Sequence, residues 1–82
     1  MNNKGIDFPQ YRKLSNEKVF YKIVDDRNFE EIQLMGKGAN KFVFIAEKYP
    51  EMLRIKDMLE CTEGYLVSTE EEFNQLIDTH SL

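Results

Sequence analysis

The feature that most constrains this chain is the pattern of side chains on either side of Asp25-Asp26-Arg27-Asn28. If residues 18–24 fold back on residues 29–35 with these four residues as the loop, Lys22 stands opposite Glu31, which is a favourable cross-strand pair. A register shifted by one residue would instead place apolar residues opposite Glu31 and Gln33. In the favoured register, one face of this predicted hairpin collects the apolar side chains Val19, Tyr21, Ile23, Ile32 and Leu34.

A second hairpin is predicted around residues 36–40, which read Gly-Lys-Gly-Ala-Asn. A five-residue connection with glycine is typical of a hairpin loop. Pairing Met35 with Lys41 places Leu34 opposite Phe42, and the same apolar face then gains Phe42, Phe44 and Ala46. Because two independent turns give one consistent face, the pattern predicts a three-stranded antiparallel meander.

Two helices and a short strand are predicted in the second half of the chain. Pro50 suits a first helical position, and Met52, Ile55 and Leu59 recur at helical spacing. Gly64 is expected to end this helix in a left-handed cap. Residues 65–67 then read as a strand. Ser68 and Thr69 are alternative N-caps for a last helix, whose apolar stripe is Phe73, Leu76 and Ile77.

These elements predict an α+β fold, in which a meander sheet of three to four antiparallel strands packs with two helices in the order β-β-β-α-β-α. Residues 8–14 contain Pro9 and could add a short edge strand in front. Eighty-two residues suffice for one domain, which buries about 60% of its unfolded surface. We expect a single domain over residues 11–80 and a flexible segment over residues 1–10.

The charge is unevenly distributed, and the net charge is −4. Residues 1–41 hold eight Lys/Arg against six Asp/Glu, whereas residues 42–82 hold three against nine. A nucleic-acid footprint is usually denser and strongly positive, and the acidic half disfavours anionic membranes. The single cysteine, Cys61, allows no disulfide within the chain. We therefore expect a cytoplasmic protein with no membrane association.

No group of residues predicts a specific reaction. The glycine-bearing stretch 36–41 is followed by a predicted strand, whereas a phosphate-binding loop leads into a helix. His80 lies near the terminus, and Cys61 lies beside Glu60 and Glu63, which disfavour its thiolate. The sequence thus predicts no enzyme, catalytic residue, cofactor or metal ion.

The reverse face of the predicted meander is unusually apolar, since six of its nine residues are apolar where a solvated face should alternate. Either a helix or the N-terminal segment covers it, or a partner docks there. The candidate partner-binding residues are Phe20, Lys22, Phe29, Glu31, Val43 and Ile45.

The predicted function is a non-catalytic protein–protein interaction module, with either a protein partner or a second copy of the chain. The alternative is an accessory protein that binds nucleic acid through its basic half, which the acidic helices disfavour. Its candidate residues are two aromatic residues, Tyr11 and Tyr21, and the six cations Arg12, Lys13, Lys18, Lys22, Lys37 and Lys41.

Residues 20–23 (Phe-Tyr-Lys-Ile), 29–33 (Phe-Glu-Glu-Ile-Gln) and 68–73 (Ser-Thr-Glu-Glu-Glu-Phe), preceded by Tyr-Arg-Lys at 11–13, carry a family resemblance. The chain resembles a group of small bacterial proteins of the Bacteroidetes type over about residues 11–80. The resemblance implies an intact single domain in a bacterial cytoplasm. It implies no activity, cofactor or site.

Overall fold

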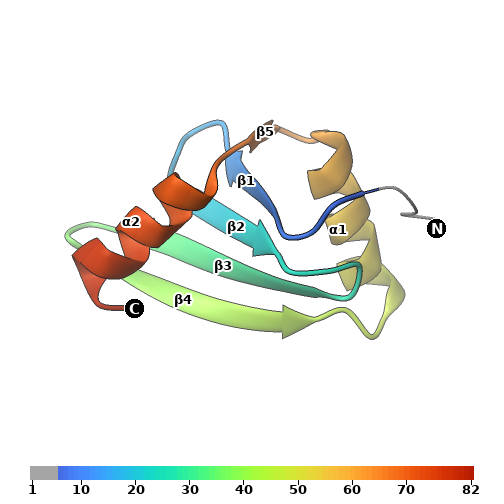
Figure 1. The fold of residues 1–82 in the computed structure, drawn as a ribbon, viewed down its shortest axis with the longest axis horizontal. Coiled ribbons are helices and arrows are strands. Elements are labelled where there is room, and N and C mark those ends of the chain that lie inside the picture. The colour runs from blue at the N-terminus through green and yellow to red at the C-terminus, as the bar shows by residue number, and fades with distance from the viewer. Residues whose placement is uncertain (1–5) are drawn as a thin grey trace.

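The described part of the chain, residues 6–82 of a computed structural model, forms one antiparallel sheet and two helices (Figure 1). The α+β class and the two helices are confirmed. The predicted count of three to four strands is wrong, because the sheet has five strands in the order β4-β3-β2-β1-β5. Along the chain the elements are β1 (Gln10–Leu14), β2 (Val19–Ile23), β3 (Asn28–Met35), β4 (Gly38–Ile45), α1 (Tyr49–Glu60), β5 (Tyr65–Val67) and α2 (Glu70–His80).

The additional strand, β1, lies inside the sheet between β2 and β5 and not at an edge. An interior position is possible because Pro9 precedes the first ladder residue, Gln10, and so removes no ladder hydrogen bond. The flexible segment predicted for residues 1–10 lies partly outside the described residues, which begin at Ile6. Phe8 packs against the hydrophobic core, and Gln10 belongs to β1.

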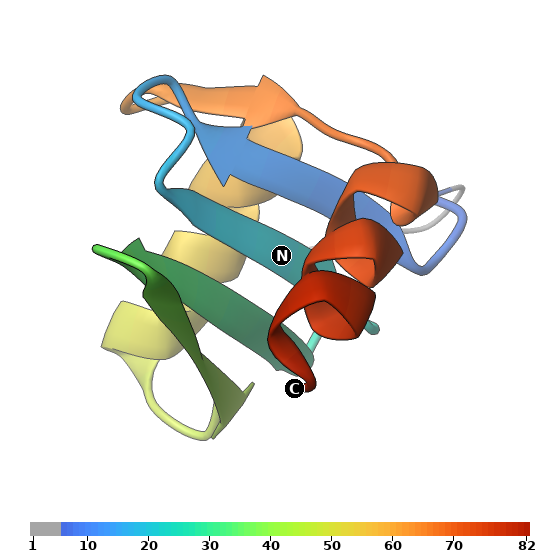
Figure 2. The ribbon, with the colours of Figure 1, turned by 90° about the vertical axis from the view of Figure 1, so that its left-hand side faces the viewer.

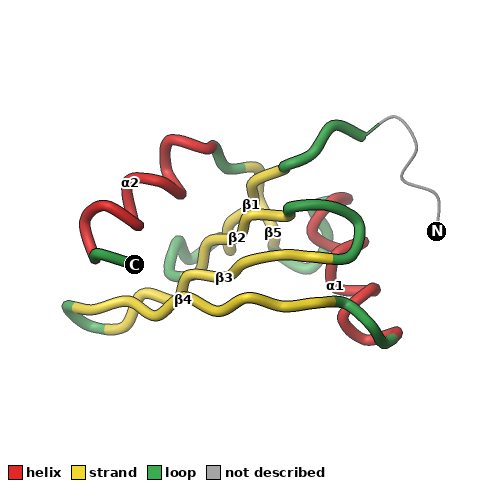
Figure 3. The backbone as a smooth tube through the Cα atoms, turned by 60° about the horizontal axis from the view of Figure 1, so that its bottom comes forward, coloured by secondary structure: helices red, strands yellow, loops and turns green. Residues whose placement is uncertain are grey.

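The two helices cover opposite faces of the sheet (Figure 2). On one, the α1 face, Tyr21, Ile23 and Phe29 pack with Ile55 and Met58 of α1. Figure 3 shows the helices at opposite ends of the sheet as well. Each helix therefore covers only part of its own face. On the other face, the α2 face, the buried cluster consists of Tyr11, Phe20, Ile32 and Phe73.

The predicted register of the first hairpin is wrong by one residue. β2 and β3 pair Ile23 with Phe29 and Tyr21 with Glu31. Each side chain of β3 therefore lies on the face of the sheet opposite to the predicted one. The N–H of Val24 donates to the carbonyl of Asn28 at 2.9 Å, which leaves a turn of residues 25–27, and within this turn the Asp25 carboxylate accepts the N–H of Arg27 at 2.8 Å. This backbone hydrogen bond is also the main reason that the pKa of Asp25 is lowered.

The second hairpin is shifted by three residues from its predicted register. Met35 pairs with Gly38 and leaves a two-residue turn, Gly36-Lys37, instead of a five-residue loop. Gly36 has a φ of +58°, as the first central residue of a type II′ turn requires. The two register shifts, of one and three residues, are both odd numbers. Each shift moves the following strand's side chains to the other face, so for β4 the two changes cancel. β2 and β4 therefore share their faces as predicted, and only β3 is reversed.

The ends of α1 are partly as predicted. Pro50 lies in its first turn, as expected. The residue that ends the helix in the left-handed conformation is Cys61, with a φ of +56°, and the prediction of Gly64 is wrong. Gly64 is also left-handed, with a φ of +85°, but it lies in the turn before β5.

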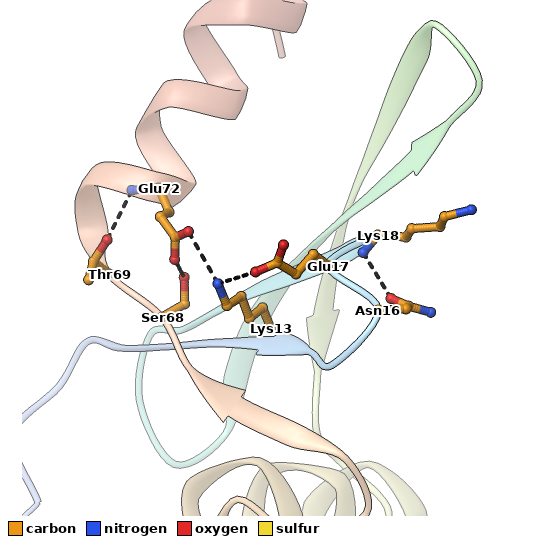
Figure 4. Close-up of polar contacts among 7 residues, drawn as sticks. All are labelled: Lys13, Asn16, Glu17, Lys18, Ser68, Thr69 and Glu72. Carbon is orange, nitrogen blue, oxygen red and sulfur yellow. Dashed lines mark hydrogen bonds and ion pairs between the residues drawn. The ribbon is translucent and has the colours of Figure 1, made fainter.

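The N-terminus of α2 is capped by Thr69, the second of the two candidates. The Thr69 hydroxyl accepts the N–H of Glu72 at 3.1 Å. Ser68 donates its hydroxyl to the Glu72 carboxylate at 2.6 Å, and the Lys13 ammonium bridges Glu72 at 3.3 Å and Glu17 at 2.7 Å (Figure 4). These contacts lower the pKa of Glu72, the Ser68 hydrogen bond most, and they fasten α2 to β1.

Candidate protein interface

The reversal of β3 separates the six predicted partner-binding residues. Four of them lie on the α2 face, and the other two, Phe29 and Glu31, lie on the α1 face, where both are buried. The prediction that all six share one surface is therefore wrong. Phe29 belongs to the hydrophobic core, where its ring stacks on Phe44 with centroids 4.8 Å apart. The four residues on the α2 face are Phe20, Lys22, Val43 and Ile45.

Glu31 is a carboxylate on a buried face, and Arg54 of α1 is the partner that makes this position possible. Arg54 Nη2 lies 3.0 Å from Glu31 Oε1, and the side-chain amide of Gln33 donates to the other carboxylate oxygen. The guanidinium also lies 5.1 Å from the centroid of the Phe29 ring and 5.5 Å from that of Phe44. A buried charge is stable when it is paired and hydrogen-bonded in this way.

Sequence reasoning missed Arg54, although a signal was present. Arg54 precedes the buried Met58 by four residues, so it lies on the side of α1 that faces the sheet. A cation at that position could have indicated a carboxylate on the facing strand. Tyr21 lies beside this pair, and burial, with the Glu31 charge second, raises the pKa of Tyr21 to about 12. The cluster is packed among core side chains, so its geometry is that of a structural ion pair.

Phe20 is covered by α2 and is not available to a partner. Its ring lies with Leu76 and Gln75 along a shallow groove between β2 and α2. α2 packs on the sheet through Phe73, whose ring centroid lies 5.8 Å from that of Tyr11 of β1 and which shares a buried cluster with Phe20 of β2. α2 therefore covers part of this face. Cover by a helix or the N-terminal segment was the first of the two alternatives that the sequence left open, and docking of a partner was the second.

The rest of the α2 face is uncovered. Val43 is 68% exposed and Ile45 is 62% exposed. Val43 lies within β4, and Ile45 is its last residue. Lys22 of β2 lies opposite Glu30 of β3, which in turn lies opposite Val43. We call this surface the β4 patch and define it as Lys22, Glu30, Lys41, Val43 and Ile45. Glu30 and Lys41 form an ion pair of 3.3 Å within it.

The β4 patch adjoins an open sheet edge. The N–H of Ala46 donates to the carbonyl of Arg27, so alternate residues back along β4 point their amides towards β3. The intervening residues, Lys41, Val43 and Ile45, therefore point their backbone groups away from the sheet. Between Ile6 and Leu82, no hydrogen bond outside the sheet ladder uses the N–H of Lys41 or Val43. β4 thus presents free donors beside exposed apolar side chains.

The opposite edge, β5, is protected by comparison. It has three residues, and the N–H of Tyr65 already donates to the carbonyl of Thr62 at 3.1 Å. A very short edge strand is one of the ways in which proteins prevent edge-to-edge pairing. Of the two edges, β4 is the one that can accept another strand.

The six cations proposed for nucleic-acid binding are not all free. Arg12 is buried, and its guanidinium donates to the carbonyls of Met58 at 2.8 Å and Tyr11 at 2.7 Å. Lys13 and Lys41 are in ion pairs with glutamates. Half of the predicted basic footprint is therefore engaged inside the protein.

The remaining sequence candidates are spread over the surface. Cys61 is an exposed free thiol at the end of α1, and His80 is the last residue of α2. In the described range, no three His, Cys, Asp or Glu side chains lie close enough together to hold a metal ion. Neither helix of the described structure has the length and apolar character needed to cross a membrane.

Comparison with known proteins found no matching family model, no matching curated protein and no matching solved structure.

Proposed function

We propose that this protein is a non-catalytic protein–protein interaction module that acts through the β4 patch. The observation that carries the proposal is the exposure of Val43 and Ile45, at 68% and 62%, on a sheet face that α2 covers only in part. Small domains need to bury most of their apolar residues for stability. Two exposed β-branched residues in one strand are therefore apolar surface that the isolated chain leaves in water and that a partner could bury.

The charges of the β4 patch support recognition of another protein. Glu30 and Lys41 neutralise each other at 3.3 Å, which leaves the exposed Val43 and Ile45 as an apolar centre with Lys22 at its rim. Interfaces between proteins typically have such an apolar centre with charged residues at the periphery. A phosphate backbone would instead favour a surface of unpaired cations, and the engagement of Arg12, Lys13 and Lys41 weighs against that alternative. We place the interaction in a bacterial cytoplasm, in keeping with the single cysteine.

Site-specific photo-crosslinking in the cells that produce the protein tests this proposal. A photoreactive side chain replaces Val43 in one variant and Val67, which is 66% exposed on the other edge strand, in a matched control. We expect a discrete protein adduct from position 43 that is weakened by Ile45→Lys, and none from position 67. The absence of an adduct at position 43, or equal adducts at both positions, would contradict the proposal.

A further inference from the structure

We infer that the partner is a second copy of this chain, and that the β4 strands of the two copies pair antiparallel to join their sheets into one. This inference rests on the proposed function, because it assigns an occupant to the same surface. A strand that pairs with its own copy about a twofold axis is necessarily antiparallel, and each copy contributes the same residues.

The backbone provides the first argument. Lys41, Val43 and Ile45 direct their N–H and C=O groups outwards along β4, an eight-residue strand. Within the described structure, only the carbonyl of Ile45 has an additional partner, the N–H of Glu47 at 3.0 Å. The ligand that matches a row of alternating donors and acceptors is another extended strand. A second β4 supplies the same row in the opposite direction.

The side chains provide the second argument, because both surfaces of β4 are apolar next to its open edge. Val43 and Ile45 are exposed on the α2 face, and Phe42, 42% exposed, lies on the α1 face. A twofold axis near Val43 would therefore bring apolar side chains together above and below the new ladder. No charged residue lies between Phe42 and Ala46, so like charges do not face each other at the centre.

Charge at the ends of the pairing also fits a second copy. With Val43 opposite Val43 of the other copy, Lys41 lies opposite Ile45 of that copy and not opposite another lysine. Lys41 already pairs with Glu30 of its own chain, which limits the cost of its desolvation. An interface of one strand per copy is at the small end of stable interfaces, so we expect micromolar association.

Sedimentation over a wide range of protein concentrations tests the inference. The wild type is expected to reach twice the 9.7 kDa of one chain as concentration rises. Val43→Pro removes the outward N–H while leaving the β3 ladder intact, because proline is tolerated in an edge strand where its nitrogen faces solvent. We expect it to raise the dimer dissociation constant at least about tenfold, the effect of losing one or two backbone hydrogen bonds.

Val67→Pro is the matched control, since Val67 has the same side chain and 66% exposure, and by strand alternation its N–H points away from β1. It should leave association unchanged. A measurement without substitution keeps the inference testable if Val43→Pro fails to fold. In wild-type protein, hydrogen exchange at the amides of Lys41 and Val43 should slow as concentration rises, whereas exchange at Val67 should not.

Three results would overturn the inference. The chain could remain monomeric at every concentration, Val43→Pro could associate like the wild type, or the amides of Lys41 and Val43 could exchange independently of concentration. If the chain is a monomer but still crosslinks to a different protein from position 43, the dimer would be rejected and the proposed function would be retained. Association lost in Val43→Lys and kept in Val43→Pro would show that the apolar face, and not the strand edge, is the contact.

Discussion

Removing Arg54 should destabilise the fold more than most surface substitutions, because it leaves Glu31 buried without a cation. The Glu31 side chain is 6% exposed and that of Arg54 is 38% exposed. Breaking a fully buried ion pair costs about 3–5 kcal/mol. Since water reaches one partner here, we expect about 2–3 kcal/mol for Arg54→Met. Methionine keeps an apolar stem over the Phe29 and Phe44 rings, so the loss reports mainly on the charge.

The assay is urea unfolding at neutral pH with a double-mutant cycle. Arg54→Lys, which keeps the charge but not the planar guanidinium, should lose about 1 kcal/mol. Glu31→Gln removes the charge that Arg54 neutralises. The double variant Glu31→Gln/Arg54→Met should therefore be more stable than the sum of the single losses by about 1–2 kcal/mol. With a slope of about 1 kcal/mol per molar urea, each of these differences is measurable.

Two results would refute this reasoning. A loss below about 0.5 kcal/mol in Arg54→Met would mean that the pair behaves like an exposed surface pair. Strict additivity in the cycle would mean that Glu31 and Arg54 stabilise the fold independently. In either case the explanation of how a carboxylate occupies the α1 face would be wrong.

Three further predictions follow from the packing and the helix cap. Burial raises the pKa of Tyr21 from 10.0 to about 12, so the stability linked to its neutral phenol is complete below pH 10 and is lost as pH rises through about 12. Relative to Tyr21→Phe, the wild type should lose up to about 3 kcal/mol over that interval in unfolding experiments, and parallel pH profiles would contradict this. Thr69→Ala should cost about 1 kcal/mol and fray the start of α2 in amide exchange, whereas unchanged protection would argue against the cap. Phe29→Ala, at a fully buried ring, should cost about 3–5 kcal/mol by thermal or urea unfolding, while the half-exposed Phe42→Ala should cost clearly less.

The sequence predicts the strands and helices well because their signals are local. The apolar spacing of α1 and Pro50 in its first turn need only neighbouring residues, and Thr69 was one of two candidate caps. The α+β class follows from the order of these elements. The interior position of β1 is harder to predict from the sequence, because five residues with a preceding proline do not indicate which strand they pair with.

Register was not predictable by the rule that apolar side chains gather on one face. That rule rejected the arrangement in which Glu31 lies opposite Tyr21, yet this is the observed pairing. The rule fails because it considers the sheet alone, whereas Arg54 comes from a helix that follows later in the chain. For the second hairpin, the type II′ preference for Gly-X turns would have favoured Gly36-Lys37 over the longer loop. Of the six candidate interface residues, the β2 and β4 members consequently share a face as expected, whereas the β3 members lie on the other face.

The shape of the two hairpins also explains why β4 carries the open edge. The two-residue turn lets β4 pair along the whole length of β3, so its eight residues extend past the shorter β2. A lysine at position 43 or 45 would have protected this edge without disturbing the core, because both side chains are exposed. The chain instead places valine and isoleucine there and keeps its one edge lysine, Lys41, paired with Glu30. An edge that is long, apolar and uncharged at its centre thus lacks the protection that edge strands usually carry.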